Sequence, residues 1–163
     1  VAASNMPVML IPAIMFGVSA MLSFATGTSW GTFGILIPII VSVCETAAPE
    51  LTVTALSAIL AGSVFGDHCS PISDTTIMSS TGAGCAHIDH VSTQLPYSLT
   101  VASVCVVGYL VAGFSAGLGF GTSLLITDVI SLLLLAVLLL VLPKIWSGEK
   151  KAVQKTPALA TQK

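Results

Sequence analysis

Residues 66–80 decide how the rest of this sequence is interpreted, and they read GDHCSPISDTTIMSS. Two carboxylates, Asp67 and Asp74, stand in a stretch that is otherwise rich in hydroxyl side chains and that has apolar segments on both sides. Gly66 and Pro71 bracket the part least able to continue as a regular helix, because proline lacks the backbone N–H and its ring clashes with the preceding turn. The pattern predicts an interruption inside an apolar helix.

The composition around this stretch is that of a membrane protein. Apolar residues make up 55% of the 163 residues, charged residues make up 7%, and the mean hydropathy is +1.01. A soluble domain usually carries about a quarter charged residues. So few charges cannot cover a globular surface, and lipid is therefore expected to be the main solvent. The net charge of −2 gives no indication of nucleic-acid binding.

The basic residues lie at one end of the chain. They are Lys144, Lys150, Lys151, Lys155 and Lys163. By the positive-inside rule we expect residues 144–163 to form a cytoplasmic tail, which its polar composition predicts to be disordered, and residues 1–143 to form the transmembrane region. The opening Val-Ala-Ala, without an initiator Met, is interpreted as the start of a fragment of a longer chain.

Apolar runs of two lengths follow one another along the chain. Residues 6–25, 97–118 and 123–142 form runs long enough to span a membrane, since about 20 residues cross the hydrocarbon core. Residues 33–44 and 51–65 form shorter runs, which are typical of re-entrant or interrupted helices. We therefore predict an all-α membrane fold, a polytopic helical bundle with interrupted or re-entrant helices.

Prolines and glycines refine this expectation. Pro12 is expected to kink the first run, residues 81–94 to form a loop, and Pro143 to end the last run. Glycines on the run at residues 97–118 would allow another helix to approach closely; they are Gly108, Gly113 and Gly117.

The two carboxylates need partners if they lie in the membrane. A carboxylate at the centre of a bilayer costs about 2.5–3.5 kcal/mol on insertion scales. No Lys or Arg precedes residue 144, so none can neutralise Asp67 or Asp74 locally. Burial disfavours the charged form of a carboxyl group, and a like-charged neighbour disfavours it further. The remaining partners are a proton and a bound cation, and such a group can exchange one for the other.

Hydroxyl oxygens in the same stretch can complete a site. An interrupted helix frees backbone carbonyls, and transporters build ion sites at the bilayer midplane in this way. Oxygen ligands suit Na⁺ better than soft or borderline metals. A solvent loop between two helices would have a similar composition and stays an alternative. The predicted Na⁺/H⁺ site consists of Asp67, Asp74, Ser70, Ser73, Thr75 and Thr76.

A second polar cluster repeats part of this pattern. Residues 27–31 read GTSWG and residues 62–66 read GSVFG, so both have glycine, a hydroxyl residue, any residue, an aromatic and glycine. Paired glycine-interrupted segments point to a transporter binding site. Thr28 and Ser29 are therefore predicted to supply oxygens from a facing element. The alternative is a helix-end turn with Trp30 as an interfacial anchor.

The histidines favour no metal site. His68 directly adjoins Cys69, and the spacing of the histidines matches no zinc template, so neither a transition metal nor a cofactor is expected. His87 and His90 are interpreted as surface-loop residues able to sense pH, because histidine titrates near neutrality. Asp128 is interpreted as an interfacial residue in the first turns of the last helix.

Three strings of residues carry a family resemblance. Residues 27–32 (GTSWGT), 66–76 (GDHCSPISDTT) and 89–97 (DHVSTQLPY) resemble the NhaC family of Na⁺/H⁺ antiporters, and the likeness covers residues 26–118. The resemblance implies a secondary transporter of the ion-transporter superfamily in the prokaryotic inner membrane, whose folds have inverted repeats and re-entrant hairpins. It also implies that the chain is the C-terminal portion of a longer one.

The residues and the resemblance together predict Na⁺/H⁺ antiport, in which Na⁺ and H⁺ compete for Asp67 and Asp74, and no enzyme activity. The main alternative is an exchanger of organic acids such as malate and lactate, coupled to Na⁺ or H⁺. A zinc-dependent intramembrane enzyme and a purely structural membrane subunit are further alternatives. The expected partners are the lipid bilayer, small cations and the upstream part of the same chain, with a homodimer as an open alternative.

Overall fold

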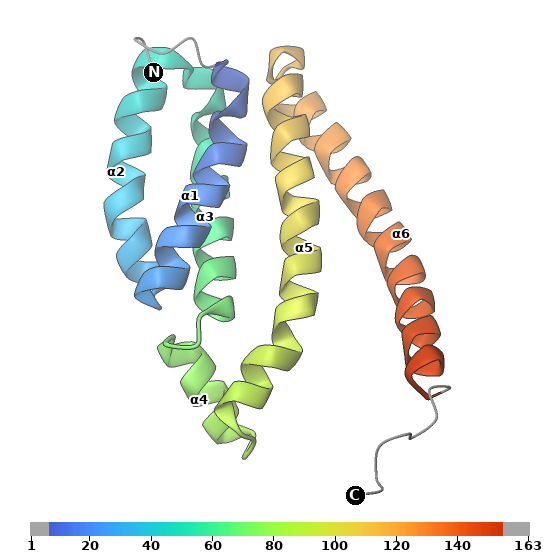
Figure 1. Cartoon of the computed structure of the whole chain (residues 1–163). Coiled ribbons are helices and arrows are strands. Elements are labelled where there is room, and N and C mark those ends of the chain that lie inside the picture. The colour runs from blue at the N-terminus through green and yellow to red at the C-terminus, as the bar shows by residue number, and fades with distance from the viewer. Residues whose placement is uncertain (1–6, 155–163) are drawn as a thin grey trace, which may run out of the picture.

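The structure is a computed structural model that describes residues 7–154, with side chains described for residues 7–141. Every regular element in this part of the chain is a helix (Figure 1). A 3-10 turn at Val8–Leu10 leads into α1 (Ile11–Thr26) and α2 (Ser29–Ala47), and a 3-10 turn at Pro49–Leu51 leads into α3 (Thr52–Cys69). There follow the short α4 (Asp74–Gly82), α5 (His87–Ser115), a 3-10 turn at Ala116–Leu118 and α6 (Phe120–Gln154).

Helices of the described chain are long and apolar enough to cross a membrane in five places. These are Val8–Thr26, Ser29–Ala47, Pro49–Cys69, His87–Leu118 and Phe120–Val141. The predicted all-α, polytopic membrane fold is thereby confirmed. In Figure 1, α1, α3 and α6 run in one direction while α2 and α5 run in the other, so α4 and the first turn of α5 lie at the end where α1 and α3 finish.

The run at residues 33–44 belongs to a full-length helix, so the expectation of a short one is wrong. α2 begins at Ser29, inside the predicted polar cluster, and is 19 residues long. Thr28 caps it, because its Oγ1 accepts a hydrogen bond from the N–H of Gly31 at 3.4 Å. The hydroxyl of Thr32 donates to the Thr28 carbonyl oxygen at 2.9 Å. Hydroxyl side chains thus bond to their own helix and extend it.

The run at residues 51–65 is extended in the same way. α3 continues to Cys69, so Gly66 lies inside a helix and is not a helix break, contrary to expectation. The chain leaves helical geometry at Ser70, whose φ and ψ are −77° and 127°, and helical geometry resumes at Asp74. The interruption therefore lies around Pro71 alone.

Three other expectations about prolines and loops differ from the structure. Pro12 lies in the first turn of α1, where its missing N–H has no partner to lose, so it marks the start of the helix. The loop expected at residues 81–94 is mostly helix, because α5 begins at His87 and continues through Pro96. The backbone of α6 likewise continues past Pro143 to Gln154, where a disordered tail was expected; residues 155–163 lie outside the described residues.

The closest helix packing joins α1 to α3, which run parallel. Gly62 and Gly66 lie one turn apart on α3, and a Cβ atom on Gly66 would overlap the carbonyl oxygen of Ala20 on α1. The hydroxyl of Ser23 donates to the carbonyl oxygen of Ser63 at 2.7 Å between the same two helices. Small residues at this spacing allow helix backbones to approach closely in a membrane. Gly62 and Gly66 therefore fix the position of the last turns of α3 against α1.

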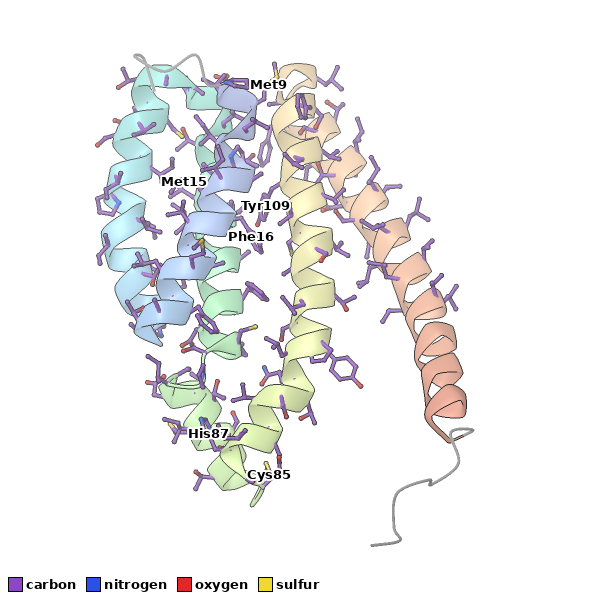
Figure 2. The ribbon with its side chains drawn as sticks, in the orientation of Figure 1. Met9, Met15, Phe16, Cys85, His87 and Tyr109 are labelled. Atoms are coloured by element: carbon purple, nitrogen blue, oxygen red, sulfur yellow. The ribbon has the colours of Figure 1, made fainter. Side chains whose placement is uncertain are left out.

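α5 covers the other side of this pair. Figure 2 shows Tyr109 of α5 reaching toward Phe16 of α1, and their ring centroids lie 5.6 Å apart. Of the glycines expected to permit close approach, Gly113 packs on the carbonyl oxygen of Met9, and a Cβ on Gly108 would lie 2.8 Å from the Ser131 hydroxyl oxygen. Gly117 has no described neighbour that a Cβ would meet.

Candidate functional site

The break between α3 and α4 brings the end of one helix to the start of the next. Ser73 is the N-cap of α4, because its Oγ accepts from the N–H of Thr76 at 3.5 Å. Asp67 lies in the last turn of α3 and is 3% exposed, while Ser73 is 0% exposed. A buried carboxylate and the buried hydroxyl that caps α4 therefore lie together at the break.

Asp67 is the one buried carboxylate among the described residues, and two hydroxyls bind it. Its Oδ1 accepts from the hydroxyl of Ser73 at 2.8 Å, and its Oδ2 accepts from the hydroxyl of Thr75 at 3.2 Å. The two hydroxyl oxygens lie 2.7 Å from each other. The three side chains thus form a closed triangle of hydrogen-bonded groups.

The triangle offers several oxygen acceptors close together. The hydroxyls of Ser73 and Thr75 carry one proton each, which they can donate to the oxygens of Asp67. Each hydroxyl oxygen keeps lone pairs, and carboxylate and hydroxyl oxygens are ligands that suit a hard cation. The arrangement therefore contains the kinds of oxygen atom that a cation site requires.

Asp74 lies apart from this triangle. It is exposed in the first turn of α4, and its Oδ1 accepts from the N–H of Thr75 at 2.7 Å. A negative charge is favourable there, because the N-terminus of a helix carries a partial positive charge. No hydrogen bond among the described residues joins Asp74 to Asp67. The two predicted carboxylates thus stand in different surroundings, one buried and one exposed.

The hydroxyls of Ser70 and Thr76, two further predicted ligands, form hydrogen bonds with backbone carbonyls at helix ends. The hydroxyl of Ser70 donates to the carbonyl oxygen of Phe24 at 2.8 Å, and that of Thr76 donates to the carbonyl oxygen of His68 at 3.5 Å. Both carbonyls lie in the last turns of their helices, where no helical N–H is available to them. Each of these hydroxyls therefore stabilises a helix end and is directed at backbone.

The turn between α1 and α2 packs against the break through its backbone. Gly27 has a φ of 68°, which favours glycine, and a Cβ there would lie 2.9 Å from the carbonyl oxygen of Ile72. Thr28 is engaged as the cap of α2, and neither it nor Ser29 forms a described hydrogen bond with the break. The facing element expected from the sequence is therefore present, but its predicted side-chain oxygens do not reach Asp67.

His87 joins the first turn of α5 to the break. Its Nε2 lies 2.6 Å from the carbonyl oxygen of Pro71, which has no proton, so this nitrogen donates. Figure 2 shows His87 at the end of the molecule formed by α4 and the start of α5. His90 is half-buried one turn further along α5 and makes no side-chain hydrogen bond among the described residues. Both histidines belong to a helix, so their assignment to a surface loop is wrong.

Ser63 was not among the residues predicted from the sequence. Its side chain is fully buried, and its Oγ has no hydrogen-bond partner among the described residues. It precedes Asp67 by one helical turn, so both residues lie on the same face of α3. The spacing of four residues was visible in the sequence, but it becomes informative only once α3 is known to continue through Gly66.

The described residues contain no group of three or more His, Cys, Asp and Glu side chains close enough to hold a metal ion. His68 is exposed, with its Nδ1 2.8 Å from the carbonyl oxygen of Val64 on the preceding turn. Its neighbour Cys69 is buried. In the part of the chain with described side chains, the zinc hypothesis therefore lacks a ligand set.

Comparisons with known proteins agree with this picture. The model of the Na⁺/H⁺ antiporter family matches residues 1–114, which include the break and all but the last residue of α5. The resemblance seen in the sequence is confirmed at this level. No solved structure matches the chain at a significant level.

Several curated proteins are similar over part of their length. An uncharacterized protein of Haemophilus influenzae is 59% identical over 111 residues, which cover 68% of this chain and 21% of that protein. An uncharacterized Na⁺/H⁺ antiporter of the same species is 39% identical over 101 residues, which cover 60% of this chain and 21% of that protein. A malate-2H⁺/Na⁺-lactate antiporter of Bacillus subtilis is 34% identical over 100 residues, which cover 61% of this chain and 21% of that protein. The chain spans about a fifth of the length of these relatives.

Proposed function

The chain belongs to the Na⁺/H⁺ antiporter family, and from that premise we propose that it exchanges Na⁺ for H⁺ at the buried carboxylate of Asp67. Membership of this family, together with the membrane-spanning helices, implies a multi-pass membrane transporter rather than an enzyme. One observation carries the finer proposal. Asp67 is buried without a basic partner, and both of its oxygens accept hydrogen bonds from hydroxyls across a helix break.

Competition between the two ions follows from the charge at this position. The buried carboxylate is neutralised either by its own proton or by Na⁺, since residues 1–143 contain no Lys or Arg. In the proton-bound state the triangle of Asp67, Ser73 and Thr75 closes on itself. In the Na⁺-bound state the same oxygens become ligands, and the free hydroxyl of Ser63 is available from the preceding turn. Binding of one ion therefore displaces the other.

The remaining predicted residues have supporting roles in this proposal. Asp74 attracts cations at the exposed side of the break, while Ser70 and Thr76 hold the break in shape. Thr28 and Ser29 lie on the turn that packs against the break, and they contribute oxygens when alternating access rearranges that contact.

The proposed membrane is the prokaryotic inner membrane, with the C-terminal lysines on the cytoplasmic side. α6 finishes at the same end of the molecule as α4 (Figure 1). The break, with Asp67, would then lie toward the cytoplasmic half of the protein. Protons and Na⁺ would reach the other side through the motions of alternating access.

The test is Na⁺-induced proton release from vesicles containing the full-length protein with Asp67→Asn, Asp74→Asn or, as a control, Asp89→Asn. Loss of a buried charged partner costs about 3–5 kcal/mol, so Asp67→Asn should slow exchange at least about a hundredfold. Asp74→Asn should reduce exchange by less, because its carboxylate is exposed, and Asp89→Asn should retain it. Full exchange by the Asp67→Asn variant would falsify the proposal.

The second candidate is exchange of an organic acid coupled to Na⁺ or H⁺. The similarity to a malate-2H⁺/Na⁺-lactate antiporter favours it, because the matched segment includes about three-fifths of this chain. The same vesicles distinguish the two candidates. Proton flux driven by Na⁺ with no organic solute present supports Na⁺/H⁺ exchange, whereas flux that appears only when malate or lactate is supplied supports the second candidate.

A further inference from the structure

A mostly apolar cavity lies away from the break, between the first turns of α3, the second half of α5 and the first turns of α6. Its volume is about 300 Å³. Ser57 of α3 lines it and precedes Asp67 by ten residues, so about 15 Å of helix separates the cavity from the proposed exchange site. The cavity is therefore distinct from the site at Asp67.

Asp128 is the one charged residue that lines this cavity. It lies about 12 Å along α6 from Phe120, within the apolar segment Phe120–Val141, whose length and composition fit a membrane span. It makes no hydrogen bond or ion pair with any residue whose side chain is described. A carboxylate inside a membrane segment marks a binding or transport function by default, and it requires a proton or a cation as partner.

Two hydroxyls beside Asp128 also lack partners. The Oγ1 of Thr127 is buried without any hydrogen bond, and Ser131 makes none with the described residues. Ser131 lies three residues after Asp128 and four after Thr127, so it is a neighbour of both on α6, and all three line the cavity. A primary ammonium group has three N–H donors. These three side chains offer it three acceptors, one of them charged.

The rest of the lining suits an alkyl chain. Aromatic rings of Tyr109 and Phe120 and the side chains of Val53 and Leu124 also line the cavity. Small-molecule sites are mostly apolar with a few polar groups that fix orientation. A bare Na⁺ requires a compact shell of oxygens and would leave most of this volume empty.

We propose that this cavity binds a primary alkylammonium ion. The ammonium head lies at Asp128, Thr127 and Ser131, and the alkyl chain lies against Tyr109 and Phe120. This site does not depend on Na⁺/H⁺ exchange at Asp67.

The experiment measures binding of n-butylammonium chloride to the full-length protein in lipid nanodiscs by calorimetry, with empty nanodiscs as the blank. Asp128→Asn should weaken binding at least tenfold. Thr127→Val, which keeps the shape and removes the hydroxyl, should weaken it about threefold to tenfold. The control Asp89→Asn, an exposed carboxylate on α5, should bind as the wild type does. Lengthening the chain from methyl to butyl should strengthen binding about fourfold per methylene.

Equal affinity in the wild type and Asp128→Asn would overturn the proposal, as would heat that empty nanodiscs reproduce. Failure here is distinguishable from failure of the proposed exchange. Asp128→Asn should retain Na⁺-induced proton release, and Asp67→Asn should retain butylammonium binding. A variant at one site that also fails the assay of the other site would contradict the independence of the two sites. A variant that fails only its own assay concerns only its own site.

Discussion

The Nε2 atom of His87 donates to the carbonyl oxygen of Pro71 over 2.6 Å, so the first turn of α5 holds the break between α3 and α4. The other ring nitrogen, Nδ1, lies 3.2 Å from the hydroxyl oxygen of Ser80 on α4. That hydroxyl has one proton, which it donates either to Nδ1 or to the carbonyl oxygen of Ile77 at 2.9 Å. His87 therefore connects α5, α4 and the break, and it does so beside the turn that positions Ser73.

Replacing His87 should weaken exchange by loosening this connection. His87→Ala removes the donor to Pro71, and a lost hydrogen bond of this kind costs about 0.5–1.5 kcal/mol, so the apparent Na⁺ affinity should fall about twofold to tenfold. His87→Gln retains an N–H donor and should recover part of the loss. The measurement is the Na⁺ concentration that gives half-maximal proton release. Equal effects of Ala and Gln would show that the bond to Pro71 is not what matters.

The triangle at Asp67 predicts that Ser73 and Thr75 act as a unit. Ser73→Ala and Thr75→Val each open the triangle and should each lower the apparent Na⁺ affinity about threefold to tenfold. Because either change breaks the same closed set of contacts, the double variant should lose less than the product of the two single effects. Ser79→Ala is the matched control, since Ser79 is exposed on α4 and its side chain forms no described hydrogen bond. Fully multiplicative losses would contradict the closed triangle.

Ser63 should matter for Na⁺ and much less for stability. Its buried hydroxyl has no partner among the described residues, so Ser63→Ala breaks no hydrogen bond of the protein. Its removal should be neutral or slightly stabilising in thermal unfolding, because it relieves a buried unsatisfied group. If the hydroxyl is a Na⁺ ligand, half-maximal Na⁺ should rise about threefold or more. An unchanged Na⁺ dependence would remove Ser63 from the ligand shell.

The contact of α3 with α1 predicts a strong difference between two glycines. A Cβ at Gly66 would overlap the Ala20 carbonyl oxygen, so Gly66→Ala should destabilise the protein by about 1–3 kcal/mol through overpacking. A Cβ at Gly34 on α2 would meet nothing, so Gly34→Ala should be neutral or stabilising by up to about 1 kcal/mol. Thermal unfolding in detergent compares the two. Similar unfolding midpoints would show that α1 and α3 are not packed through this face.

Composition and Pro71 were sufficient to predict the membrane fold and the place of the break. The lengths of α2 and α3 were not predictable in the same way, because polar residues in a sequence look like helix ends. Thr32 shows why this is misleading, since its hydroxyl bonds to the carbonyl oxygen of Thr28 within the helix. Gly66 was misread for a related reason: a glycine that lets another helix approach closely has the same sequence appearance as one that ends a helix.

The candidate site was predictable in part. The contacts of Ser73 and Thr75 with Asp67 could be expected from the sequence, because the break folds the chain back within a few residues. Their role as ion ligands stays a prediction. Asp74 was predicted to share a site with Asp67 because the two residues are close in sequence. The direction of α4 leaves Asp74 exposed and apart from the buried Asp67. The bond from His87 to Pro71 depends on where α5 begins, and no local pattern predicts a helix start at residue 87.

The single buried carboxylate has a consequence for energy coupling. If the proposed exchange uses Asp67 as its one ion-binding carboxylate, each Na⁺ that binds displaces one proton, and a full cycle moves no net charge across the bilayer. Such an exchange would respond to the Na⁺ and proton concentration gradients and not to membrane voltage. Voltage-dependent exchange would show that a further charged group takes part in the cycle.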